Sequence, residues 1–120
     1  MADIEKGIKQ LSELMGEQAA KGAYEHFKKF DEPFANFLFG STFGDIWARP
    51  GLATKLRSLI TVAGLTVMGR GPELRAHLQG ALRIGWTPDE LKEVIIHMSQ
   101  YGGMPTSIEA IQIFEEVTKK

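Results

Sequence analysis

The chain has 120 residues, of which 43% are hydrophobic, and this length and composition fit one globular domain with a small core. Fourteen Lys and Arg against fifteen Asp and Glu give a formal net charge of -1, which excludes the strongly basic composition typical of nucleic-acid-binding and membrane-surface proteins. The absence of cysteine excludes disulfides, thiolate metal ligands and thiol catalysis within this chain.

The N-terminal residues lack the charged-then-apolar order of a signal peptide, and the apolar runs are too short to cross a bilayer. We therefore expect a soluble cytoplasmic protein that binds neither a membrane nor nucleic acid.

The first third of the chain predicts helices. Residues 3–15 have an amphipathic pattern that Gly16 ends, and residues 17–30 follow with Phe30 on their apolar face. Asp31 is suited to cap a third helix. Residues 34–47 continue it and are rich in aromatics, which either fill the core or form a subunit contact; Gly40 to Gly44 interrupt the pattern.

Four further helices are predicted after the turn at residues 49–52. Residues 54–68 carry so little polar surface that we expect them to form the central helix. Residues 72–84 form the next helix. Thr87, Pro88 and Glu90 have the arrangement of a capping box at the start of another. The last helix starts near residue 104, and four of its apolar side chains are expected to face inward: Ile108, Ile111, Phe114 and Val117.

No segment has the alternating pattern of a β-strand. The sequence therefore predicts an all-α, compact bundle of about six or seven helices, with residues 1–120 as a single domain.

Residues 70–85 contain the most promising chemical group. His77 shares the apolar stripe of this helix, and Glu73 lies one turn before it, where a carboxylate can accept the imidazole N–H and favour the protonated ring. The pair is thus a candidate acid–base site. The alternative is a packing histidine beside an ordinary first-turn acid. The three histidines lie on three different predicted helices, so we expect no metal site.

Four segments in order carry a family resemblance: FGDIWARPGL at 43–52, RSLITVA at 57–63, HLQGALRIG at 77–85, and ELKEVIIH with YGGMP at 90–97 and 101–105. In these segments, which lie between residues 43 and 105, the sequence resembles the carboxymuconolactone decarboxylase family and its 4-carboxymuconolactone decarboxylase branch. The resemblance implies an all-helical protein that forms a homo-oligomer, a hexamer or a trimer.

The wider superfamily includes alkylhydroperoxidase D-like proteins, whose peroxidase site is a glutamate, a Cys-x-x-Cys pair and a histidine. His77 matches that histidine, but the cysteine positions fall on Arg70 and Glu73 and the glutamate position falls on Ser58. We therefore do not expect cysteine-dependent peroxidase chemistry.

The resemblance implies a carboxy-lyase that removes a carboxylate from a small unsaturated lactone, giving 3-oxoadipate enol-lactone in aromatic catabolism, without a cofactor. Such a reaction needs cations for the substrate carboxylates and one acid to protonate a ring carbon. His77 is then the proton donor, with Glu73 holding it charged. The expected substrate contacts are Arg49, Arg57, Arg70, His97 and Tyr101.

Each contact has a structural alternative. Arg49 can instead pair with Asp45, Arg57 can bind helix-end carbonyls, and His97 and Tyr101 can be packing residues. At the level of function, the alternatives are a superfamily member with an antioxidant activity but no cysteine pair, and a non-catalytic oligomeric binding protein.

Overall fold

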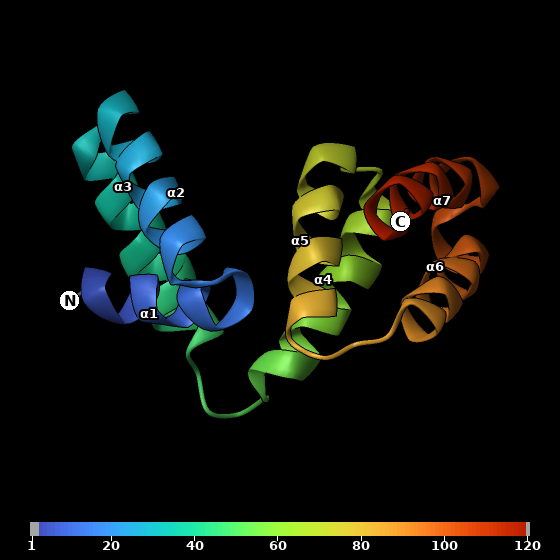
Figure 1. Cartoon of the computed structure of the whole chain (residues 1–120), viewed down its shortest axis with the longest axis horizontal. Coiled ribbons are helices and arrows are strands. Elements are labelled where there is room, and N and C mark those ends of the chain that lie inside the picture. Colours follow the sequence, from blue (N-terminus) through green and yellow to red (C-terminus); the bar gives the residue numbers. More distant parts are fainter. Residues whose placement is uncertain (1–2, 120) are drawn as a thin grey trace. The chain divides into compact units, whose positions relative to one another are not determined.

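The computed structural model describes residues 3–119, and all the regular elements among them are helical (Figure 1). This confirms the all-α prediction. Contacts divide the chain into two compact units, one ending at Thr54 and the other starting at Lys55. The single-domain assignment stays a prediction. The first unit contains α1 (Ile4–Met15), α2 (Glu17–Phe30), α3 (Glu32–Phe37) and a π-helix, η1 (Leu38–Trp47). The helices of the second are α4 (Thr54–Met68), which begins at the unit boundary, α5 (Gly71–Arg83), α6 (Pro88–Gly102) and α7 (Met104–Thr118).

The first unit is organised by a close approach of α1 to η1. Asp3 caps α1 by accepting a hydrogen bond from the Lys6 amide at 3.0 Å. One turn later, a Cβ atom added to Gly7 would lie 1.8 Å from the Phe39 carbonyl oxygen. Glycine is therefore required at residue 7 by the packing of two helix backbones.

The segment predicted as an interrupted helix over residues 34–47 is continuous but changes type. The α-helix ends at Phe37 and a π-helix follows, at whose end the Ala48 amide bonds the Phe43 carbonyl five residues back. Gly40 and Gly44 are buried within it. Gly44 in particular faces Asp3, whose carbonyl oxygen would be 2.9 Å from an added Cβ. The glycines therefore allow α1 to pack close to the π-helix, and they do not end the π-helix.

The aromatic side chains of this unit divide between core and surface. Phe39 is fully buried and meets Tyr24 edge-on, with ring centroids 5.2 Å apart. Phe34 and Phe37 are exposed. Phe30, expected on the apolar face of α2, is also exposed, because the buried residue of that helix is Ala20.

The second unit has its own core, to which α5 contributes most. Leu74, Leu78 and Ala81 of α5 are buried together with residues of α4, α6 and α7. The expectation that α4 is the central helix was wrong. Only one stripe of α4 is fully buried, and Leu56, Ile60 and Met68 on its other side are exposed: the buried residues are Ser58, Val62 and Thr66.

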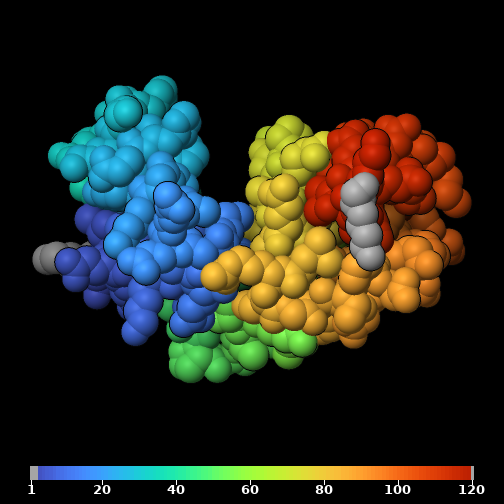
Figure 2. All heavy atoms as spheres, in the orientation of Figure 1, coloured from blue at the N-terminus to red at the C-terminus, as the bar shows by residue number. Residues whose placement is uncertain are grey.

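α6 and α7 pack against each other, and their atoms lie side by side in Figure 2. The predicted capping box at the start of α6 is confirmed: the Glu90 amide donates to Thr87 Oγ1 at 3.1 Å, and the Thr87 amide donates to Glu90 Oε1 at 2.9 Å. Ser107 Oγ of α7 donates to the Ile95 carbonyl of α6 at 3.2 Å.

The prediction that four apolar residues of α7 face inward was partly wrong. The helix buries its small residues, Ser107 and Ala110, against the core, which turns Ile108 and Ile111 outward. Phe114 and Val117 pack against the core as expected. None of the helices in the described part of the chain has both the length and the apolar character needed to span a bilayer.

Candidate functional site

Three of the predicted site residues lie along the first turns of α5. Arg70 is the residue preceding the helix, and its Nη2 donates to Glu73 Oε1 at 2.8 Å. His77 follows one turn after Glu73. Its side chain is half-buried, and the residues Leu74 and Leu78 on either side of it in the helix are buried. A cation, a carboxylate and an imidazole thus occur in succession on one helix.

The electrostatics of this group differ from the prediction in one respect. The Arg70 hydrogen bond, assisted by the backbone amide at the helix start, lowers the pKa of Glu73, so this exposed carboxyl is ionised. Burial lowers the pKa of His77, and the nearby Glu73 charge only partly offsets that effect. The expectation that Glu73 holds His77 protonated was therefore wrong: desolvation outweighs the carboxylate, which Arg70 already neutralises in part.

The other two arginines lie on different parts of the fold. Arg57 is half-buried in the second turn of α4 and belongs to the second unit. Arg49 is exposed in the turn after η1, in the first unit, where its amide donates to the Ile46 carbonyl at 3.2 Å. Their roles as substrate contacts stay predictions.

His97 and Tyr101 form a separate pair on α6. Their rings are 5.6 Å apart, and both side chains are exposed. His97 also lines a shallow groove of about 500 Å³ between α4 and α6, whose other walls are mainly apolar. The sequence correctly placed the two residues on one helical face, and their roles as substrate contacts stay predictions.

Two polar residues were not predicted to matter. Glu93 lines the same groove as His97, one turn before it. Ser58 is fully buried in α4, and its hydroxyl has no hydrogen-bond partner among the described residues. A serine in a helix ordinarily bonds the carbonyl four residues back, so the sequence carries no signal for an unsatisfied hydroxyl.

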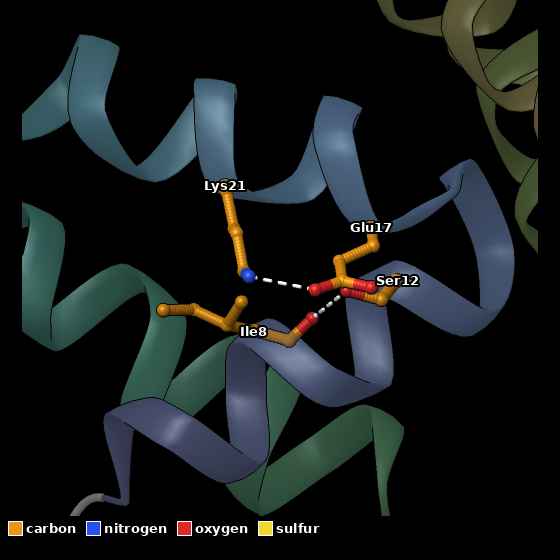
Figure 3. A network of polar contacts seen from close by, with 4 residues as sticks. All are labelled: Ile8, Ser12, Glu17 and Lys21. Carbon is orange, nitrogen blue, oxygen red and sulfur yellow. Dashed lines mark hydrogen bonds and ion pairs between the residues drawn. The ribbon is translucent and has the colours of Figure 1, made fainter.

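A second groove, of about 470 Å³, lies between α1 and α2. Figure 3 shows Glu17 and Lys21 extending from α2 toward α1, where they form an ion pair of 2.6 Å above Ile8 and Ser12. Glu5 and Lys9 add one charge of each sign. The opposite charges balance locally, so this groove has no excess positive charge for an anionic ligand.

Within residues 3–119, no three His, Asp or Glu side chains gather in a way that could hold a metal ion. The side chains at the start of α5 offer a guanidinium for binding an anion and a partly desolvated imidazole for moving a proton.

Known proteins that are similar to this chain include two that are named as decarboxylases. The chain is 41% identical over 114 residues to a 4-carboxymuconolactone decarboxylase of Acinetobacter baylyi, an alignment covering 95% of this chain and 85% of the relative. It is 30% identical over 113 residues to the nitrosuccinic acid decarboxylase npaB of Metarhizium robertsii, covering 94% of this chain and 79% of the relative. A 15.0 kDa protein of Paracoccus denitrificans is 39% identical over 127 residues, covering 98% and 95%.

The family model for carboxymuconolactone decarboxylases matches residues 32–116, which include the last helices of the first unit and nearly all of the second. The matched residues include Arg49 in the turn after η1, the group of Arg70, Glu73 and His77, and the pair of His97 and Tyr101. The chain therefore belongs to the carboxymuconolactone decarboxylase family.

Proposed function

We propose that this protein is a cofactor-free carboxy-lyase that converts 4-carboxymuconolactone to 3-oxoadipate enol-lactone in the catabolism of aromatic compounds. The observation that carries this proposal is the 41% identity, over 95% of the chain, to a relative named for that activity. The enzyme acts in the cytoplasm as a homo-oligomer.

The reaction needs no cofactor because the substrate contains its own electron acceptor. When the bond between the ring carbon and the carboxylate breaks, carbon dioxide leaves and the electron pair moves through the double bond to the lactone carbonyl oxygen. One proton then adds to a ring carbon. The protein must hold the anionic substrate, stabilise the oxyanion and deliver that proton.

His77 is the proton carrier in this proposal. In the free protein its imidazole is favoured in the neutral form, because burial lowers its pKa. A bound carboxylate placed beside it adds a second negative charge to that of Glu73, which raises the pKa of His77 and loads the ring with a proton. Substrate binding thereby prepares the acid that the protonation step consumes.

Arginines supply the positive charge for binding. Arg70 precedes α5, about two turns before His77, and already holds a carboxylate, that of Glu73, with one of its nitrogens. Arg57 and Arg49 are the other proposed carboxylate contacts, and His97 and Tyr101 are proposed as additional donors. Replacing a true carboxylate contact by glutamine raises KM, which steady-state kinetics of the single variants measures.

The decisive experiment follows loss of 4-carboxymuconolactone and release of carbon dioxide with wild type and His77→Ala. We expect kcat to fall about a hundredfold or more, the usual contribution of a positioned acid. Gln79→Ala is the matched control, because Gln79 is an exposed residue of the same helix, and it should keep wild-type activity. An inert wild type contradicts the proposed substrate, and an active His77→Ala contradicts the assigned acid.

A second candidate substrate class is a nitro acid, favoured by the 30% identity to a nitrosuccinic acid decarboxylase. A nitro group accepts the electron pair of a neighbouring carbon–carboxylate bond as a nitronate, so the same cation and proton carrier serve both reactions. Assaying nitrosuccinate beside 4-carboxymuconolactone distinguishes the two by their kcat/KM values.

A further inference from the structure

Glu93 and His97 lie one turn apart on α6 and line the same groove, of about 500 Å³, between α4 and α6. Both side chains are exposed. Residues four apart on a helix share one face, so the carboxylate and the imidazole are both accessible to a ligand in the groove. The groove therefore combines the volume of a small-molecule site with two groups that can act on its occupant.

The rest of the groove is apolar. Among the described residues that line it, none is a lysine or an arginine. A carboxylate that enters the groove therefore loses hydration without gaining an ammonium or guanidinium partner, which is unfavourable. The apolar lining residues come from both helices and are Leu59, Ile60, Ala63, Val94, Ile96 and Met98.

The charge of Glu93 adds to this effect. Two other carboxylates of the second unit are paired with arginines, Glu73 with Arg70 and Glu116 with Arg75. Glu93 forms no such salt bridge with any residue that the structure describes. Its negative charge therefore acts on the occupant of the groove and repels an anion there.

Repulsion of a carboxylate can accelerate a decarboxylation. The substrate of the proposed reaction has one carboxylate that leaves and one that stays in the product. As the bond to the leaving carboxylate breaks, the electron pair moves to the lactone carbonyl oxygen, and the carboxylate becomes uncharged carbon dioxide. An apolar groove with a fixed negative charge disfavours the starting carboxylate and not the carbon dioxide, so the barrier from the bound state falls.

We propose that the groove between α4 and α6 receives the leaving carboxylate of the substrate, and that Glu93 is a catalytic residue that destabilises this carboxylate in the bound substrate. The inference rests on the proposed function, which makes His97 a substrate contact and so brings the substrate to this groove. The carboxylate that stays in the product is bound by arginine, and this binding offsets the repulsion. The same arrangement serves the second candidate substrate, nitrosuccinate, which also has two carboxylates.

Steady-state kinetics of Glu93→Gln with 4-carboxymuconolactone tests this role. Removing the charge stabilises the bound substrate more than the transition state, in which the leaving carboxylate has already lost part of its charge. We therefore expect kcat and KM to fall together, each by about tenfold, and kcat/KM to change by less than about threefold. Loss of an acid would instead lower kcat alone, and loss of a carboxylate contact would raise KM.

Inhibition by the product gives an independent measurement. Because 3-oxoadipate enol-lactone lacks the leaving carboxylate, its inhibition constant should differ by less than about twofold between wild type and Glu93→Gln. Glu93→Asp keeps the charge, and its KM should be closer to that of wild type than to that of Glu93→Gln.

Glu115→Gln is the matched control. Glu115 is also an exposed glutamate, but it lines a different groove, between α6 and α7, so this variant loses the same charge and should keep the wild-type kcat and KM. Circular dichroism checks that each variant is folded.

A folded Glu93→Gln protein in which kcat and KM do not fall together overturns the inference, and so does an inhibition constant of the product that falls as much as KM. With an active wild type, these results leave the proposed function intact. A wild type that is inert with 4-carboxymuconolactone contradicts the proposed substrate, and the kinetic comparison is then made with nitrosuccinate. A wild type that is inert with both substrates overturns the proposed function and the inference together.

Discussion

His77 links the candidate site to the stability of the protein. Burial lowers its pKa below the ordinary value of 6.5, so the unfolded chain binds more protons than the folded one between the two values. The free energy of unfolding must therefore rise with pH in that interval, and the advantage is lost as the pH falls through the folded pKa. The buried imidazole is thus a source of acid sensitivity.

Replacing His77 by Gln should flatten this dependence. Urea unfolding of wild type and His77→Gln at a series of pH values from 7.5 to 5.5 measures it, since the carboxylates titrate below that range. We expect wild type to lose stability on acidification and the variant to lose less. Parallel curves for the two proteins would show that His77 is not desolvated in solution.

Ser58 leads to a prediction of opposite sign. Its buried hydroxyl lacks a partner among the described residues, so Ser58→Ala should leave stability unchanged or raise it by up to about 1 kcal/mol. Ser107 is the matched control: it is also a buried helical serine, but its hydroxyl bonds the Ile95 carbonyl, and Ser107→Ala should cost about 1 kcal/mol.

Urea unfolding measures both serine variants. If Ser58→Ala destabilises the protein as much as Ser107→Ala does, then the Ser58 hydroxyl has a partner in solution. A loss of decarboxylase activity in a stabilised Ser58→Ala protein would instead show that the hydroxyl is kept for function at the expense of stability.

At the scale of the helices, the contact between α1 and η1 makes the sharpest prediction. A methyl group at residue 7 cannot fit 1.8 Å from the Phe39 carbonyl oxygen, so Gly7→Ala must separate two helix backbones. We expect a loss of about 3 kcal/mol or more. Gly22, in α2 of the same unit, has open space at its Cβ position, and Gly22→Ala should stabilise by up to about 1 kcal/mol.

Thermal unfolding of Gly7→Ala and Gly22→Ala tests this pair directly. The opposite signs are the essential result, because propensity alone favours alanine at both helical positions. Equal stabilisation by the two substitutions would mean that α1 and η1 do not approach as closely as described.

Helix boundaries were the most predictable feature of these elements, because the residues that cap or end a helix act on their immediate neighbours in the chain. The capping box at Thr87 and Glu90 and the cap at Asp31 are present as predicted, and Gly16 ends α1 with a φ of 96°. The π-helix was not predictable in the same way. The backbone amides of residues 38–47 can bond the carbonyl four residues back or the one five residues back. Which of the two they bond depends on the packing of this segment against α1, which lies some thirty residues earlier in the chain.

Periodicity also identified the apolar faces without deciding which of them are covered. In α5 the predicted stripe is the buried one, but in α7 Ile108 and Ile111 face outward because small residues make the closer contact. The same limit applies to the site. The spacing of Glu73 and His77 was correct, whereas the protonation of His77 depends on burial and on the Arg70 bond, which are properties of the folded protein.

At the scale of the whole chain, the two compact units carry different parts of the proposed chemistry. The second unit contains Arg57, Arg70 and His77, and the first contains Arg49. The family model spans the boundary between them, so the family is defined by both units and not by the α5 site alone.

The π-helix has a consequence for changes in chain length. Its turns hold more residues than those of an α-helix, and such segments carry one residue beyond what an α-helical path requires. Losing a single residue near its exposed positions, such as Asp45 or Ile46, can be absorbed by tightening one turn into α-helical bonding. The same loss within α5 would rotate every later side chain by about 100° and remove Leu78 and Ala81 from the core. Segment 38–47 is therefore where this chain can shorten while keeping its helices.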